Sequence, residues 1–91
     1  KAHMGAGSIT SNVKSDKTLV VVKSPDGRQF ETGRKKFGAM LGDSVEVGCN
    51  SVLNPGTVIG RESNVYPLSC VRGVVPAGHI FKAPGNVVAK R

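Results

Sequence analysis

The sequence predicts an all-β fold: a three-sided parallel β-helix with a β-hairpin inserted into it. Between residues 41 and 76, six successive six-residue blocks each open with an aliphatic side chain, namely Leu41, Val47, Leu53, Ile59, Val65 and Val71. A small or β-branched residue follows four positions later in every block: Val45, Ser51, Thr57, Ser63, Ser69 and Val75. A period of six suits a short strand followed by a corner, so three blocks close one triangular coil and the next coil stacks on it.

The two columns have different expected places in such a prism. The aliphatic residue that opens each block points inward, because the inner face of a parallel coil contains no water, and the small residue fills a corner. Three glycines directly follow aliphatic residues, and their missing Cβ is compatible with close packing between coils: Gly42, Gly48 and Gly60. The outer bends are expected to place four residues in left-handed backbone conformations: Asn50, Asn54, Gly56 and Asn64.

The repeat stops between Asn12 and Ala39, where a hairpin is predicted. Residues 18–23 are mostly β-branched and apolar, residues 24–27 read Ser-Pro-Asp-Gly, and residues 28–32 place Phe30 among polar side chains. This pattern is typical of two strands joined by a tight turn, which leaves a corner of the prism without disturbing the coils.

We therefore expect one β-helix domain over residues 1–91. It is divided into a truncated N-terminal coil (1–12), an inserted basic hairpin (13–38), two regular coils (39–76) and a closing segment (77–91). Met4 opens a block with Ser8 in the small column, and Ala2 falls in the small column of a block that would open before Lys1. The chain is thus expected to be a C-terminal fragment of a longer protein.

The charge balance favours anionic partners. Thirteen Lys and Arg face six Asp and Glu, and the net charge of +7 is concentrated around the hairpin, in Lys14, Lys17, Lys23, Arg28, Arg34, Lys35 and Lys36. A nucleic-acid partner is not expected, because only four aromatic residues and no nucleic-acid module are present. Basic side chains that merely solvate an exposed insertion are the alternative.

The sequence argues against a membrane-spanning protein and against a disulfide-linked one. No stretch of 18 apolar residues exists, which argues against a membrane span. Cys49 and Cys70 are expected to lie beyond disulfide reach, with about 10 Å of strand and one inter-coil spacing of about 4.8 Å between them. Reduced thiols agree with a cytoplasmic protein.

The six-residue blocks, together with the closing Val75-Pro76-Ala77-Gly78-His79-Ile80, resemble the hexapeptide-repeat family. Its members are left-handed parallel β-helices and mostly acyltransferases that use a coenzyme A thioester, so the resemblance alone supplies the handedness. The run from Met4 to Asn12, followed after the hairpin by residues 41–50, is similar to the acetyltransferase half of the N-acetylglucosamine-1-phosphate uridylyltransferases. It is more similar still to the UDP-N-acetylglucosamine pyrophosphorylase-related proteins, in which a nucleotidyltransferase domain precedes the β-helix. The similarity covers roughly residues 3 to 82, with the hairpin longer here.

This resemblance implies a set of site residues. The general-base histidine of the family would lie upstream of Lys1, so the chain alone is expected to be inactive. Four residues match or stand in for positions that contact the sugar: His3, Asn12, Lys14 and Lys17. Three positions correspond to backbone that lines the coenzyme A groove: Ala6, Cys49 and Pro67. No metal is expected, because a zinc site of the related γ-class carbonic anhydrases needs three histidines and only His3 and His79 are present.

Two functions remain open at this point. The first is an enzymatic homotrimer whose clefts bind acetyl-CoA as co-substrate and a phosphorylated amino sugar, with no covalently bound cofactor. The second is a non-catalytic trimerisation or regulatory domain of a sugar-1-phosphate nucleotidyltransferase. Gly5, Ala6, Gly7 and Asn12 favour the first function, whereas Cys49 and Pro67, which replace smaller residues, favour the second. Any nucleotidyltransferase chemistry lies outside these 91 residues.

Overall fold

The computed structural model describes residues 2–12, 14, 18–24 and 28–90, which form short strands and no helix. The strands that precede the regular coils are β1 (His3–Met4), β2 (Ile9–Thr10), β3 (Val21–Lys23) and β4 (Gln29–Glu31). The coils contain β5 (Met40–Leu41), β6 (Glu46–Val47), β7 (Val52–Leu53), β8 (Val58–Ile59), β9 (Asn64–Val65), β10 (Cys70–Val71) and β11 (Val74–Val75). The chain closes with β12 (His79–Ala83) and β13 (Asn86–Ala89). The predicted all-β class is confirmed.

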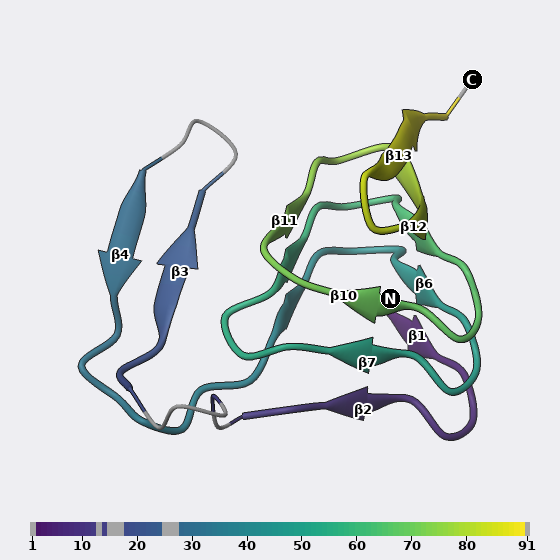
Figure 1. The fold of residues 1–91 in the computed structure, drawn as a ribbon. Coiled ribbons are helices and arrows are strands. Elements are labelled where there is room, and N and C mark those ends of the chain that lie inside the picture. Colours follow the sequence, from purple (N-terminus) through teal and green to yellow (C-terminus); the bar gives the residue numbers. More distant parts are fainter. Residues whose placement is uncertain (1, 13, 15–17, 25–27, 91) are drawn as a thin grey trace.

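Three parallel sheets form the sides of a triangular prism (Figure 1). Face 1 contains β1, β6, β9 and β12, face 2 contains β2, β7 and β10, and face 3 contains β5, β8 and β11. The register is that of the six-residue period, because Val47 pairs with Val65 and Leu53 with Val71, each one coil apart. Each sheet thus stacks every third block, as the repeat predicts.

The predicted aliphatic column forms the core. Val47, Leu53, Ile59, Val65 and Val71 are each at most 3% exposed and belong to one cluster. Full burial of such a side chain stabilises the fold by about 1.5–3 kcal/mol. Most blocks therefore contribute one large side chain to the core, and Val45 and Val75 add a second one in the first and last of the six blocks.

The small column fills the corners as predicted and also forms hydrogen bonds. The buried Ser51 hydroxyl donates to the Tyr66 carbonyl (3.1 Å) and accepts the Ser69 N–H (3.3 Å). Ser63 donates to the Pro76 carbonyl at 2.7 Å. These hydroxyls join each corner to the corner of the coil above. The small size of the residues, on which the prediction was based, does not by itself indicate these hydrogen bonds.

The last block differs from the sequence prediction. Val75 does not occupy a corner but pairs with the inward Ile59, only four residues after Val71. The corner is shortened at Gly73, which has a φ of 84° and whose carbonyl accepts the Val58 N–H at 2.8 Å. The assignment of Val75 to the small column was wrong because a glycine permits a turn too tight for the six-residue period.

The left-handed corner positions were predicted correctly in part. Asn50 (φ 56°) and Gly56 (φ 80°) adopt that conformation, whereas Asn54 and Asn64 do not. The structure places the left-handed residue three positions after the inward aliphatic one, at Gly7, Ser44, Asn50, Gly56, Glu62, Leu68 and Gly78. Asn54 instead donates its side-chain amide to the Val71 carbonyl, and Asn64 lies within β9.

The inserted hairpin is confirmed and stands beside face 3 (Figure 1). Antiparallel β3 and β4 pair Val22 with Phe30, while the turn at residues 25–27 lies outside the described residues. The hairpin rests on the corner of the second coil, where a Cβ on Gly56 would lie 2.7 Å from the Val21 carbonyl oxygen. That glycine is therefore required for the contact as well as for the turn.

A second antiparallel hairpin closes the far end of the prism. Strand β12 continues face 1 by pairing Phe81 with Val65, and β13 turns back against β12. Lys90 at the end of β13 donates to the Glu62 carbonyl and to Asn64 Oδ1, both at 2.9 Å. Within the described ranges, no helix is long and apolar enough to span a membrane.

We predict that Gly48→Ala destabilises the fold by about 1–3 kcal/mol, because overpacking against fixed backbone has this cost. A Cβ at this position would lie 2.4 Å from the Pro67 backbone nitrogen in the next coil. Gly38→Ala is the matched control, since its Cβ would meet nothing nearer than Thr10 Oγ1 at 3.8 Å. Chemical denaturation of both variants measures the difference, and equal midpoints would contradict this view of coil packing.

Candidate functional site

The three outer faces of the prism differ in chemistry. The residue before each inward aliphatic points outward, since successive side chains of a strand alternate. On face 1 the first three of these residues are polar: His3, Glu46 and Asn64. On face 2 they are Ile9, Val52 and Cys70, and on face 3 they are Met40, Val58 and Val74. One polar face thus lies between two faces that are largely apolar.

The three residues predicted to line a coenzyme A groove lie together at the corner between faces 1 and 2. Ala6, Cys49 and Pro67 are all exposed and occupy the same position in successive coils. The Asn50 N–H donates to the Ala6 carbonyl and the Leu68 N–H to the Cys49 carbonyl, both at 2.9 Å. We call this stack of Ala6, Cys49 and Pro67 the corner ladder. It is a strip of exposed residues whose Ala6 and Cys49 carbonyls are bonded to the next coil, and its ligand remains a prediction.

Close approach between coils builds this ladder. A Cβ on Gly5 would lie 2.8 Å from the Cys49 backbone nitrogen, and one on Gly48 would lie 2.4 Å from that of Pro67. The glycine in each coil therefore allows the exposed backbone of the next coil to lie directly over it. The aromatic ring of Tyr66 borders the ladder, with Lys82 Nζ 6.0 Å from its centroid.

The residues predicted to bind the sugar are not brought together within one chain. His3 is exposed on face 1, at a hollow of about 470 Å³ that Ser44 and Glu46 also line. Asn12 is exposed beyond β2, at the base of the hairpin, where its carbonyl accepts the Phe37 N–H at 2.8 Å. Lys14 is half-buried, and Lys17 lies outside the described residues.

Sequence reasoning missed a polar column on face 1. Asn64 donates its amide to Glu46 Oε2 at 3.3 Å and accepts a hydrogen bond from Lys90 Nζ at 2.9 Å. Glu46 in turn pairs in register with His3 one coil below. The signal was present in the sequence, because these residues immediately precede the inward aliphatic in successive coils.

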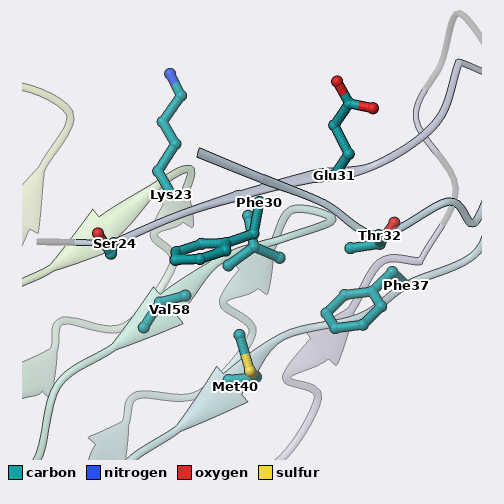
Figure 2. Close-up of a pocket in the computed structure, with 9 residues that line it drawn as sticks. Lys23, Ser24, Phe30, Glu31, Thr32, Phe37, Met40 and Val58 are labelled. Atoms are coloured by element: carbon teal, nitrogen blue, oxygen red, sulfur yellow. The ribbon is translucent and has the colours of Figure 1, made fainter. Parts of the chain in front are cut away.

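Sequence reasoning also missed an apolar groove between the hairpin and face 3. We call it the hairpin groove; its volume is about 400 Å³, and Val22, Phe30, Phe37, Met40 and Val58 supply its apolar lining. Figure 2 shows the Phe30 ring above Val58 and Met40, with Lys23 and Glu31 pointing outward from its rim. Phe30 is 52% exposed and Met40 44% exposed.

The remaining polar candidates do not form a further site. Cys49 and Cys70 are both free, as predicted, and both are exposed, with Cys70 on face 2 and Cys49 at the corner. His79 forms a 2.9 Å hydrogen bond through Nδ1 with the carbonyl of Ala77. In the part of the chain that the structure describes, no three His, Cys, Asp or Glu residues gather as metal ligands would.

The fold is shared with a solved structure of galactoside acetyltransferase in complex with coenzyme A. The match covers 100% of this chain and 44% of that one, with a TM-score of 0.51 and 23% identity. The chain therefore has the left-handed parallel β-helix fold. The handedness implied by the family resemblance is thus confirmed, and no protein-family model matches the sequence.

Two of three curated proteins similar to this β-helix are transferases by name. A bifunctional sugar-1-phosphate nucleotidylyltransferase/acetyltransferase of Sulfurisphaera tokodaii is 35% identical over 80 residues, which are 88% of this chain and 20% of that protein. The putative uncharacterized acetyltransferase YaiX of Escherichia coli K12 is 31% identical over 86% of this chain and 34% of its own. The bifunctional protein GlmU of Methanococcus vannielii is 28% identical over 98% and 21%, respectively. The β-helix therefore spans a fifth to a third of these relatives.

We predict that Ser51→Ala destabilises the β-helix by about 1–3 kcal/mol, because the buried Ser69 N–H loses its acceptor. Ser11→Ala is the control, since its hydroxyl makes no hydrogen bond within the described residues. Thermal unfolding compares the two variants. A Ser51→Ala midpoint equal to that of Ser11→Ala would show that the corner hydroxyl is dispensable.

Proposed function

We propose that this β-helix binds acetyl-CoA and a phosphorylated amino sugar for acetyl transfer, within a sugar-1-phosphate nucleotidylyltransferase/acetyltransferase. The observation that carries the proposal is the corner ladder, where Ala6, Cys49 and Pro67 lie exposed at the same position of three successive coils. The relatedness to a bifunctional enzyme of that name and the fold shared with a coenzyme A complex support it.

Transfer of an acetyl group from a thioester to an amine has two requirements. The thioester carbonyl must be held beside an amine, and the amine must lose its proton before it attacks that carbon and displaces the thiolate. The ladder supplies a surface for the donor, and the net charge of +7 favours the phosphates of both ligands. No residue of this chain is assigned to the proton transfer.

We propose that the β-helix acts as a homotrimer in the cytoplasm. Its outer faces 2 and 3 present Ile9, Val52, Met40 and Val58, and contiguous apolar surface of this kind marks association. His3 and Asn12 lie on different parts of one chain, so a neighbouring copy is needed to bring such residues to one ligand. Free cysteines fit a reducing compartment.

A non-catalytic trimerisation or regulatory domain is the second candidate. Pro67 favours it, because proline has no N–H and removes one donor from the corner ladder. A ligand carbonyl that hydrogen-bonds along the ladder then finds one partner fewer. The two candidates share the trimer and differ in whether acetyl-CoA binds.

We predict that acetyl-CoA binds the protein in calorimetric titration and that Ala6→Trp weakens this binding about tenfold or more, equivalent to about 1.4 kcal/mol. A bulky ring at Ala6 would cover the ladder. Ala83→Trp is the matched control, because Ala83 is also exposed but lies in the closing hairpin. Absence of binding at millimolar acetyl-CoA would overturn the acyltransferase proposal and leave the second candidate.

A further inference from the structure

An exposed leucine projects from the corner between faces 1 and 2. Leu68 is 78% exposed and adopts a φ of 61°, a conformation that is unfavourable for a branched side chain. The equivalent corner positions in the coils below are Gly7 and Asn50, residue types that tolerate it. A leucine at this position neither packs in the core nor suits the turn. Folding alone does not explain it.

The surroundings of Leu68 make this corner an apolar projection. Pro67 is exposed and Tyr66 is 44% exposed, so three consecutive residues present apolar surface to solvent. We call residues 66–68 the corner knob. Its backbone is fixed, because the Leu68 N–H donates to the Cys49 carbonyl at 2.9 Å. A rigid apolar projection of this kind loses little conformational entropy when it is buried.

The hairpin groove is the complementary feature on another side of the chain. Its apolar lining is open, with Phe30 and Met40 each about half exposed, and Figure 2 shows their side chains facing a common space. At about 400 Å³ it lies near the lower end of the range for small-molecule sites, and it is of a size to receive a few side-chain tips.

The knob and the groove cannot meet within one chain, because the knob lies where faces 1 and 2 join and the groove lies on face 3. Two different patches of one chain that fit each other form a heterologous contact, which closes into a ring when the rotation allows it. Along the prism axis the two are nearly level, since Leu68 follows Val58 by little more than half a coil and one coil rises about 4.8 Å. Copies with parallel axes can therefore meet without sliding.

We propose that Leu68, the tip of the corner knob of one copy, inserts into the hairpin groove of the next and thereby closes a ring of three, while Pro67 stays at the ladder. This rests on the trimer of the proposed function. Lys82 lies beside Tyr66 at the knob, and the rim of the groove carries Glu31, of opposite charge to Lys82, together with Lys23, of the same charge. The neighbour's Lys23 and Glu31 would then border the corner ladder, so that each ligand site is built from two copies.

Three single variants of the full-length protein test the contact, with the oligomeric state measured by sedimentation velocity. Leu68→Asn replaces the apolar side chain of the knob by one that tolerates the left-handed corner. The thermal unfolding midpoint of the subunit should therefore not fall. Met40→Glu places a charge on the groove floor from an outward position. Val87→Glu is the control, at an apolar residue of β13 that is 37% exposed, compared with 44% for Met40. We expect Leu68→Asn and Met40→Glu to raise the trimer dissociation constant about 30-fold or more, as loss of an interface hot spot does, and Val87→Glu to leave it unchanged.

A mixture of the two deficient variants gives the sharper result. Leu68→Asn keeps an intact groove and Met40→Glu keeps an intact knob, so an equimolar mixture should form a one-to-one dimer that neither variant forms alone. A wild-type monomer would overturn the trimer and this contact together. A wild-type trimer that persists in Leu68→Asn, or a mixture that stays monomeric, would overturn the knob and groove while leaving the trimer and acetyl-CoA binding intact.

Discussion

Direct contact between the backbones of successive coils is the constraint on which the rest of this structure depends. At Gly5, Gly42, Gly48 and Gly60 an added Cβ would lie less than 3.0 Å from backbone atoms of the coil above. Such approach holds the aliphatic column in register and leaves a narrow interior that branched side chains fill. The same approach brings the exposed backbone of the corners into line. Core and candidate site are therefore consequences of one spacing.

Much of the fold could be predicted from the sequence, because a six-residue period reports directly on that spacing. The inward column from Leu41 to Val71 followed from it. The hairpin between Asn12 and Ala39 followed from the β-branched run and the tight turn found where the repeat stops. The shortened corner at Gly73 did not, since a two-residue contraction changes register without leaving a gap in the aliphatic pattern. Asn54 and Asn64 were misplaced for a different reason. Their amides bond to neighbouring coils, and that competition cannot be evaluated from residue type alone.

The candidate site was predictable only where it depends on repeat position. Ala6, Cys49 and Pro67 share one position in successive coils, so the resemblance placed them together correctly. The hairpin groove joins residues from the insertion to residues of face 3, and no periodicity relates them. The column of His3, Glu46 and Asn64 could have been predicted from the sequence. These residues hold the outward position in every third block, and comparing that position between coils would have shown that they stack.

The closing hairpin has a consequence for how identical prisms can meet end to end. Parallel β-helices carry strand edges at their ends, and an arriving copy in matching register could extend all three sheets into a fibre. Here β13 runs antiparallel to β12 and covers the edge of face 1, while the contracted turn at Gly73 shifts the last rung out of the eighteen-residue spacing. A copy approaching from this end meets a reversed strand on one side and a mismatched rung on another. In-register extension of faces 1 and 3 from this end is thereby disfavoured.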